Sequence, residues 1–152
     1  MALVWSDLVY STGLAQIDAQ HQELFKQINA LLEKSVLEES AEDIKKLLEF
    51  LGNYVLTHFK YEEEIMEQQT CSKRYANVIA HRKFIKDFKA LKSRFEKEGA
   101  SPAFIVDTQS LLVKWLSNHI IKIDCALRDT CASKPPQTLN YSVQPTQSAN
   151  PQ

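Results

Sequence analysis

The chain has 152 residues, of which 44% are hydrophobic and 24% are charged, a composition typical of one globular domain that excludes a disordered or fibrous protein. Its 18 lysines and arginines nearly balance 19 aspartates and glutamates, so net charge favours neither nucleic acid nor an anionic membrane as a partner. No apolar run approaches the roughly 20 residues of a spanning helix and the start lacks a secretory signal pattern, so we expect a cytoplasmic location.

The first hundred residues contain almost no helix breakers. Only three glycines occur and all prolines lie from Pro102 onward, so we expect an all-α protein. The first helix should begin at Asp18 as its N-cap and run to about residue 37, preceded by an arm over residues 1–17. Its apolar stripe, at steps of three and four, consists of Ile17, His21, Leu24, Ile28 and Leu31.

A second and a third helix follow. Ser40 with Asp43 three residues later resembles a capping arrangement, so the second helix should cover residues 41–67. The third should cover residues 73–98 and end at Gly99, which suits a C-terminal cap. Their stripes carry Ile44, Leu48, Leu51, Val55, His58 and Glu62 in the second, and Asn77, His81, Phe84, Phe88, Leu91 and Phe95 in the third.

The fourth helix should begin at Ser101 and Pro102 and end near Arg128. Its expected stripe is Ile105, Leu112, Leu116, His119 and Ile123. Four amphipathic helices with short connections predict an antiparallel up-and-down four-helix bundle with an N-terminal arm, over residues 1–131. Residues 132–152 are rich in Pro, Gln, Ser, Asn and Thr, so we expect a flexible tail or linker there.

The three cysteines form no CxxC pair and are odd in number, which argues against a disulfide framework. In a cytosolic chain we expect Cys71, Cys125 and Cys131 to be reduced bystanders, with Cys131 exposed.

The four histidines fall one on each predicted helix, and each interrupts an apolar stripe. One buried histidine is usually explained by a hydrogen bond to a neighbour, but four of four on buried faces favour a shared site. His21 and His81 lie early in their helices, whereas His58 and His119 lie late. Antiparallel helices bring such positions to the same end of a bundle, so we expect one layer of imidazoles.

Two carboxylates are candidates for the same layer. Glu62 follows His58 by four residues and therefore shares its face. Asp124 follows His119 by five, an offset of about 140° on an ideal helix, so the pattern leaves open whether it belongs to the site. Carboxylates among buried imidazoles require cations. Six candidate ligands exceed a zinc site and favour a metal pair; iron suits these ligand types, and manganese or a mixed pair also fits.

The same residues resemble the hemerythrin family, in particular its bacterial members. The resemblance rests on Trp5, "GLAQIDAQHQEL", "HFKYEEEIM", His81 and "WLSNHIIKID", and it covers roughly residues 3–128. It implies a bundle that holds two non-haem iron ions with a bridging oxo or hydroxo group and takes O2 as ligand. By position, His21 and His58 would bind the iron that takes O2. His81 and His119 would bind the second iron, and Glu62 and Asp124 would bridge the pair.

One position departs from the family pattern. The third helix of hemerythrins carries HxxxH, and this chain has Asn77 at the first of those positions. An amide oxygen is a poorer iron ligand than an imidazole nitrogen, so the second iron is expected to keep a position for water or an external ligand. We therefore expect rapid ligand exchange and autoxidation, or the loss of one metal ion.

Four apolar residues flank the ligand positions and are expected to line a dry pocket for a small diatomic, although each fits plain bundle core equally well: Phe59, Trp115, Leu116 and Ile120. We expect an O2 or redox sensor, the input module of a signalling protein with an output domain fused after the tail, more than a catalyst. The alternatives are a peroxidase-like or NO-reducing diiron oxidoreductase, a simple O2 carrier or storage protein, and a metal-free interaction module.

Overall fold

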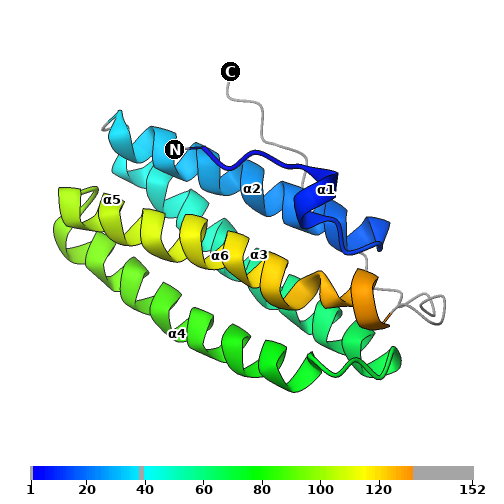
Figure 1. Ribbon diagram of the computed structural model, residues 1–152. Coiled ribbons are helices and arrows are strands. Elements are labelled where there is room, and N and C mark those ends of the chain that lie inside the picture. Colours follow the sequence, from blue (N-terminus) through cyan, green and yellow to red (C-terminus); the bar gives the residue numbers. More distant parts are fainter. Residues whose placement is uncertain (1, 38–39, 132–152) are drawn as a thin grey trace.

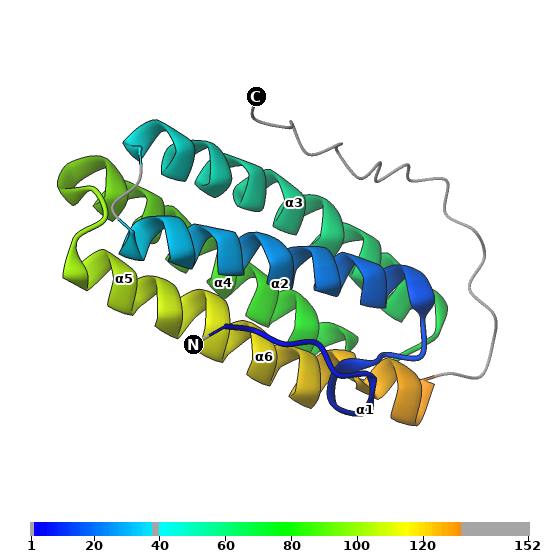
Figure 2. The same ribbon diagram turned by 90° about the horizontal axis from the view of Figure 1, so that it is seen from above.

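The computed structural model describes residues 2–37 and 40–131, and every regular element in these ranges is a helix. Four rods run antiparallel to one another (Figures 1 and 2): α2 (Ala15–Val36), α3 (Ala41–Gln68), α4 (Arg74–Glu98) and a fourth rod over residues 102–131. The predicted four-helix bundle is confirmed. The tail predicted for residues 132–152 lies outside the described residues. Within the described ranges, the helices are too short or too polar to span a membrane.

The arm that precedes α2 contains the short helix α1 (Asp7–Tyr10), which lies beside the fourth rod (Figure 1). Trp5 packs its ring against Tyr10 and against Phe25 of α2, with ring centroids 5.6 Å apart in both pairs. The arm is thus held to the bundle by an aromatic cluster.

The prediction that Asp18 caps α2 is wrong, because the helix begins at Ala15 and Asp18 lies one turn inside it. Its carboxylate accepts hydrogen bonds from the backbone N–H and hydroxyl of Thr12, at 2.8 and 2.7 Å, and from the Ser11 hydroxyl at 2.7 Å. Asp18 therefore fixes the end of the arm rather than the start of its own helix.

Apart from the end of the fourth rod, the other predicted helix ends agree with the structure to within one residue. Ser40 is the N-cap of α3, although its side chain makes no capping hydrogen bond. Gly99 ends α4 with a φ of 64°, a left-handed value that favours glycine. Ser101 caps the fourth rod by accepting a hydrogen bond from the Phe104 N–H at 3.1 Å.

The fourth rod differs from a plain α-helix. Two α-helical segments, α5 (Pro102–Thr108) and α6 (Leu116–His119), alternate with three π-helical segments, η1 (Gln109–Trp115), η2 (Ile120–Asp124) and η3 (Leu127–Cys131). The rod therefore ends at Cys131, beyond the predicted end at Arg128. A π-helical turn is wider than an α-helical one, because each N–H bonds to the carbonyl five residues earlier.

The wider turns change which side chains the fourth rod buries. Buried residues recur every four positions: Phe104, Thr108, Leu112, Leu116, Ile120 and Asp124. The predicted stripe is correct at Leu112, Leu116 and His119 but wrong at Ile105 and Ile123, which are only partly buried. Ile123 lies in the π-helical segment η2, where the turn is wider than the 3.6 residues assumed, whereas Ile105 lies in α5 next to the buried Phe104.

The prediction of reduced cysteines is also wrong for two of the three. Cys71, in the connection between α3 and α4, forms a disulfide with Cys131 across a sequence separation of 60, and both residues are buried. Cys125 is free and buried. The up-and-down topology brings the α3–α4 connection and the end of the fourth rod to the same end of the bundle, a proximity that cysteine spacing does not reveal.

Candidate metal centre

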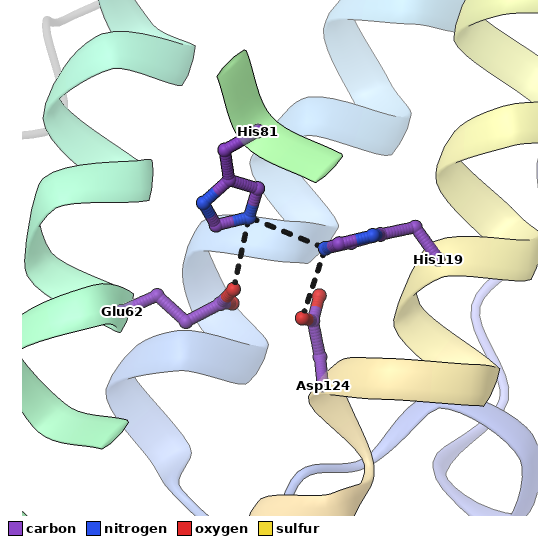
Figure 3. Close-up of side chains that lie close together, drawn as sticks. All are labelled: Glu62, His81, His119 and Asp124. Carbon is purple, nitrogen blue, oxygen red and sulfur yellow. Dashed lines mark hydrogen bonds and ion pairs between the residues drawn. The ribbon is translucent and has the colours of Figure 1, made fainter. Parts of the chain in front are cut away.

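The four histidines and two carboxylates singled out from the sequence converge in one layer of the bundle. Each rod contributes at least one of them: His21 from α2, His58 and Glu62 from α3, His81 from α4, and His119 and Asp124 from the fourth rod. All six are buried, with relative exposures from 0% to 5%. Figure 3 shows Glu62, His81, His119 and Asp124 pointing toward one another from three rods.

Glu62 lies at the middle of this layer, and its two oxygens face different pairs of groups. Oε2 lies 3.2 Å from Nε2 of His21 and 3.3 Å from Nε2 of His58. Oε1 lies 3.3 Å from Nε2 of His81 and accepts a hydrogen bond from Nδ2 of Asn77 at 2.9 Å. One carboxylate therefore connects the imidazoles of His21 and His58 with the imidazole of His81.

Asp124 also contacts imidazoles from two different rods. Its Oδ2 lies 3.4 Å from Nε2 of His21, and its Oδ1 lies 3.1 Å from Nε2 of His119. The offset of five residues from His119, which fits poorly on an α-helix, fits the π-helical turn of η2, where the Cys125 N–H bonds to the Ile120 carbonyl at 2.9 Å. The widened turn returns Asp124 to the face of His119.

Two groups of donor atoms result, each with its atoms within 4.8 Å of one another. One consists of His21, His58 and Glu62, and the other of Glu62, His81, His119 and Asp124. Nε2 of His81 and Nε2 of His119 lie only 3.2 Å apart, and Oδ1 of Asp124 lies 3.1 Å from the latter nitrogen. Such convergence of lone pairs in a buried layer fits cations, and imidazole with carboxylate ligation suits iron.

Two further polar residues contact the Nδ1 atoms of two of these imidazoles. Oε1 of Gln20 lies 2.7 Å from Nδ1 of His58, and Oε1 of Glu63 lies 3.3 Å from Nδ1 of His81. Contacts of this kind fix the tautomer and leave Nε2 free to face the interior. Sequence reasoning missed both residues, because each is the immediate neighbour of a candidate ligand and neighbours on a helix point in different directions.

Burial and mutual contacts shift the pKa values of several imidazoles in the layer. Burial lowers the pKa of both His58 and His119 to about 4. Burial also acts to lower the pKa of His81, but hydrogen bonds to Glu62 and Glu63 outweigh it and raise that pKa to about 9. The two carboxylates thus favour the protonated form of His81.

The two carboxylates shift in opposite directions. Burial acts to raise the pKa of Glu62, but the surrounding histidines hold it well below its usual range. Burial and the negative charge of Glu62 raise the pKa of Asp124 well above its usual range. The two carboxylates of the layer therefore favour different protonation states.

The four predicted pocket residues lie next to these imidazoles. Phe59 stacks on His81 with ring centroids 3.7 Å apart, and Trp115 stacks on His119 at 4.5 Å. Leu116 and Ile120 are buried in the core. Their role in lining a pocket for a ligand stays a prediction.

The polar layer separates two apolar clusters. The larger one fills most of the bundle and includes Phe59 and Leu116. The smaller one closes the end of the bundle that carries the disulfide, and it includes Ile17, Met66 and Leu127. Apolar packing on both sides leaves the layer little access to water, which strengthens the electrostatic interactions within it.

Comparisons with known proteins agree with this geometry. Residues 12–127 match the family model described as Hemerythrin HHE cation binding domain. The chain is 33% identical to a bacteriohemerythrin of Pseudomonas aeruginosa over 127 residues, covering 84% of this chain and 80% of the relative. It is 31% identical to a bacteriohemerythrin of Methylococcus capsulatus over 125 residues, covering 82% and 93%.

A relative outside the bacteriohemerythrins and a solved structure extend the comparison. A hemerythrin-like protein of Naegleria gruberi is 31% identical over 115 residues, covering 75% of this chain and 82% of that protein. The crystal structure of a wild-type hemerythrin superposes with a TM-score of 0.75 at 28% identity, covering 88% of this chain and all of that one.

Proposed function

Since this chain belongs to the hemerythrin family, we propose that it binds two non-haem iron ions and O2, and that it serves as an oxygen or redox sensor. The observation that carries the iron proposal is the arrangement of Glu62, whose two oxygens face two different pairs of groups within one buried layer. A carboxylate with this arrangement suits two metal ions better than one.

The proposed ligands divide between the two ions. His21 and His58 hold the ion proposed to take O2, and His81 and His119 hold the second. Glu62 and Asp124 offer one oxygen to each, as their separate oxygen-to-nitrogen contacts support. A ferrous pair, when bound, supplies two electrons to O2.

The surrounding residues orient the ligands and keep water away. Gln20 and Glu63 hold Nδ1 of His58 and of His81, so that Nε2 of each ring points into the layer. The rings of Phe59 and Trp115 cover two imidazoles. Leu116 and Ile120 complete the proposed dry pocket, in which protons and water reach bound O2 slowly.

We prefer a sensor to a storage protein because the donor set of the proposed second ion holds two imidazoles, and the buried Asn77 stands where the family pattern has a third. Weaker ligation favours ligand exchange and oxidation to the ferric state. The proposal includes a cytoplasmic location and an output domain fused after the tail predicted for residues 132–152. An oxygenated form that persists for many hours would favour storage.

The second candidate is a peroxidase-like or NO-reducing diiron oxidoreductase, and the same Asn77 favours it, because an exchangeable position suits turnover. Reduction of peroxide by a dye, at a rate far above that of free iron, would support this candidate. Two bound irons with no turnover would leave the binding function.

Anaerobic loading with ferrous iron, metal analysis and absorption spectra before and after exposure to air test the main proposal. We expect two irons per chain and new near-ultraviolet and visible absorption in air. The exposed Asn53 on α3 offers a matched control, since Asn53→His adds an imidazole outside the layer and should change neither result. A folded protein that retains no iron would overturn the proposal.

A further inference from the structure

Asn77 is a buried amide that contacts the layer from α4, one turn before His81. Its exposure is 0%. Its Nδ2 donates hydrogen bonds to Oε1 of Glu62 at 2.9 Å and to Sδ of Met66 at 3.3 Å. Its Oδ1 has no hydrogen-bond partner within the described residues.

These two contacts fix the orientation of the amide. A carboxylate oxygen and a thioether sulfur only accept hydrogen bonds, so both require the NH2 group of Asn77 on their side. Turning the amide over would bring its oxygen against Glu62 and Met66, where two electron-rich atoms repel it. Asn77 is therefore a donor that positions Glu62, and its oxygen is directed away from that carboxylate oxygen.

The two halves of the layer then offer equal sets of protein donors. The half near α2 has His21 and His58 with one oxygen each from Glu62 and Asp124. The other half has His81 and His119 with the remaining oxygens of the same two carboxylates. Two imidazoles with carboxylate oxygens form the kind of set that leaves positions on non-haem iron open to exogenous ligands.

We propose that the second iron position, the one held by His81 and His119, binds a small exogenous ligand of its own, so that the centre takes two such ligands instead of one. The ligand class is a small anion or protic molecule. This inference rests on the diiron function proposed above and adds the number of ligands and the residue that sets it.

Azide titration of the iron-loaded, air-oxidised protein tests the inference, with calorimetry and absorption as two readouts and iron content measured first. We expect two azides per chain that holds two irons. Asn77→His supplies a third imidazole to the second position and should reduce the count to one. Asn53→His, at an exposed position on α3, should leave it at two.

A second variant separates positioning from ligation. Asn77→Ala removes the donor to Glu62 but adds no ligand, so it should still bind two azides while losing iron more readily to a chelator. Two irons with a single azide in the unaltered protein would overturn the inference and leave the diiron function intact. Fewer than two irons per chain would overturn both. A count unchanged by Asn77→His would show that position 77 does not set the number of ligands.

Discussion

Replacing Glu62 by glutamine perturbs both halves of the candidate centre with one change. Glutamine has nearly the same shape, so packing between the two apolar clusters is preserved. The change removes the charge and replaces one of the two shared oxygens by an NH2 group. Loss of Oε2 removes the oxygen that lies 3.2 and 3.3 Å from His21 and His58, and loss of Oε1 removes the one that lies 3.3 Å from His81.

The expected loss of affinity is large. The donor atoms of each group lie within 4.8 Å of one another, so a cation among them is within about 3 Å of the carboxylate. At an effective dielectric constant of about 20, a divalent ion and a carboxylate at that distance attract by about 10 kcal/mol. Solvation offsets much of this; removing one partner from a buried ion pair costs about 3–5 kcal/mol. Iron should therefore bind at least about 100-fold more weakly.

The assay is iron retention against a graded chelator after anaerobic loading, with thermal unfolding followed in parallel. We expect Glu62→Gln to retain at most one iron per chain and to remain helical. Glu67→Gln, one to two turns further along α3 at a side chain that is 66% exposed, is the matched control and should retain both. Two irons retained by Glu62→Gln with unchanged affinity would refute the shared-carboxylate arrangement.

Three further predictions concern the surroundings of the site. Reduction of the Cys71–Cys131 disulfide, which spans 60 residues, should lower the free energy of unfolding by up to about 4 kcal/mol in urea titrations, and the Cys71→Ser/Cys131→Ser variant should not respond to reductant. Iron affinity should fall as pH falls, because the pKa of His81 is about 9 and iron must displace the proton on that imidazole. Calorimetry in buffers of different ionisation enthalpy should detect the release of this proton. An iron affinity that does not depend on pH would contradict the prediction. Gln20→Leu should weaken iron binding about 10- to 100-fold, because Nδ1 of His58 loses its partner at 2.7 Å, and an unchanged affinity would argue against that contact.

The alternation of early and late histidines along four amphipathic helices was enough to predict the fold and the common layer. His21 and His81 near the starts, with His58 and His119 near the ends, meet only if the helices run antiparallel, and the structure has them within one buried layer. Stripe periodicity works well where helices are regular, as in α2, α3 and α4.

The features that sequence reasoning missed depend on geometry that 3.6-residue periodicity does not encode. Asp124 reaches the site through a π-helical turn, and the misplaced Ile123 lies in that same turn. The pairing of Cys71 with Cys131 depends on which ends of the rods meet in space. Capping statistics favoured Asp18 as a helix start, whereas a local turn with Thr12 uses its carboxylate.

The central claim, two iron ions sharing Glu62 and Asp124 in one buried layer, is tested most directly by Mössbauer spectroscopy of the protein loaded with iron-57 and oxidised in air. The account predicts two irons per chain whose spins are coupled, so that the spectrum shows no magnetic splitting in a weak field at low temperature. A single iron per chain, or two irons with the spectrum of isolated paramagnetic ferric ions, would contradict it.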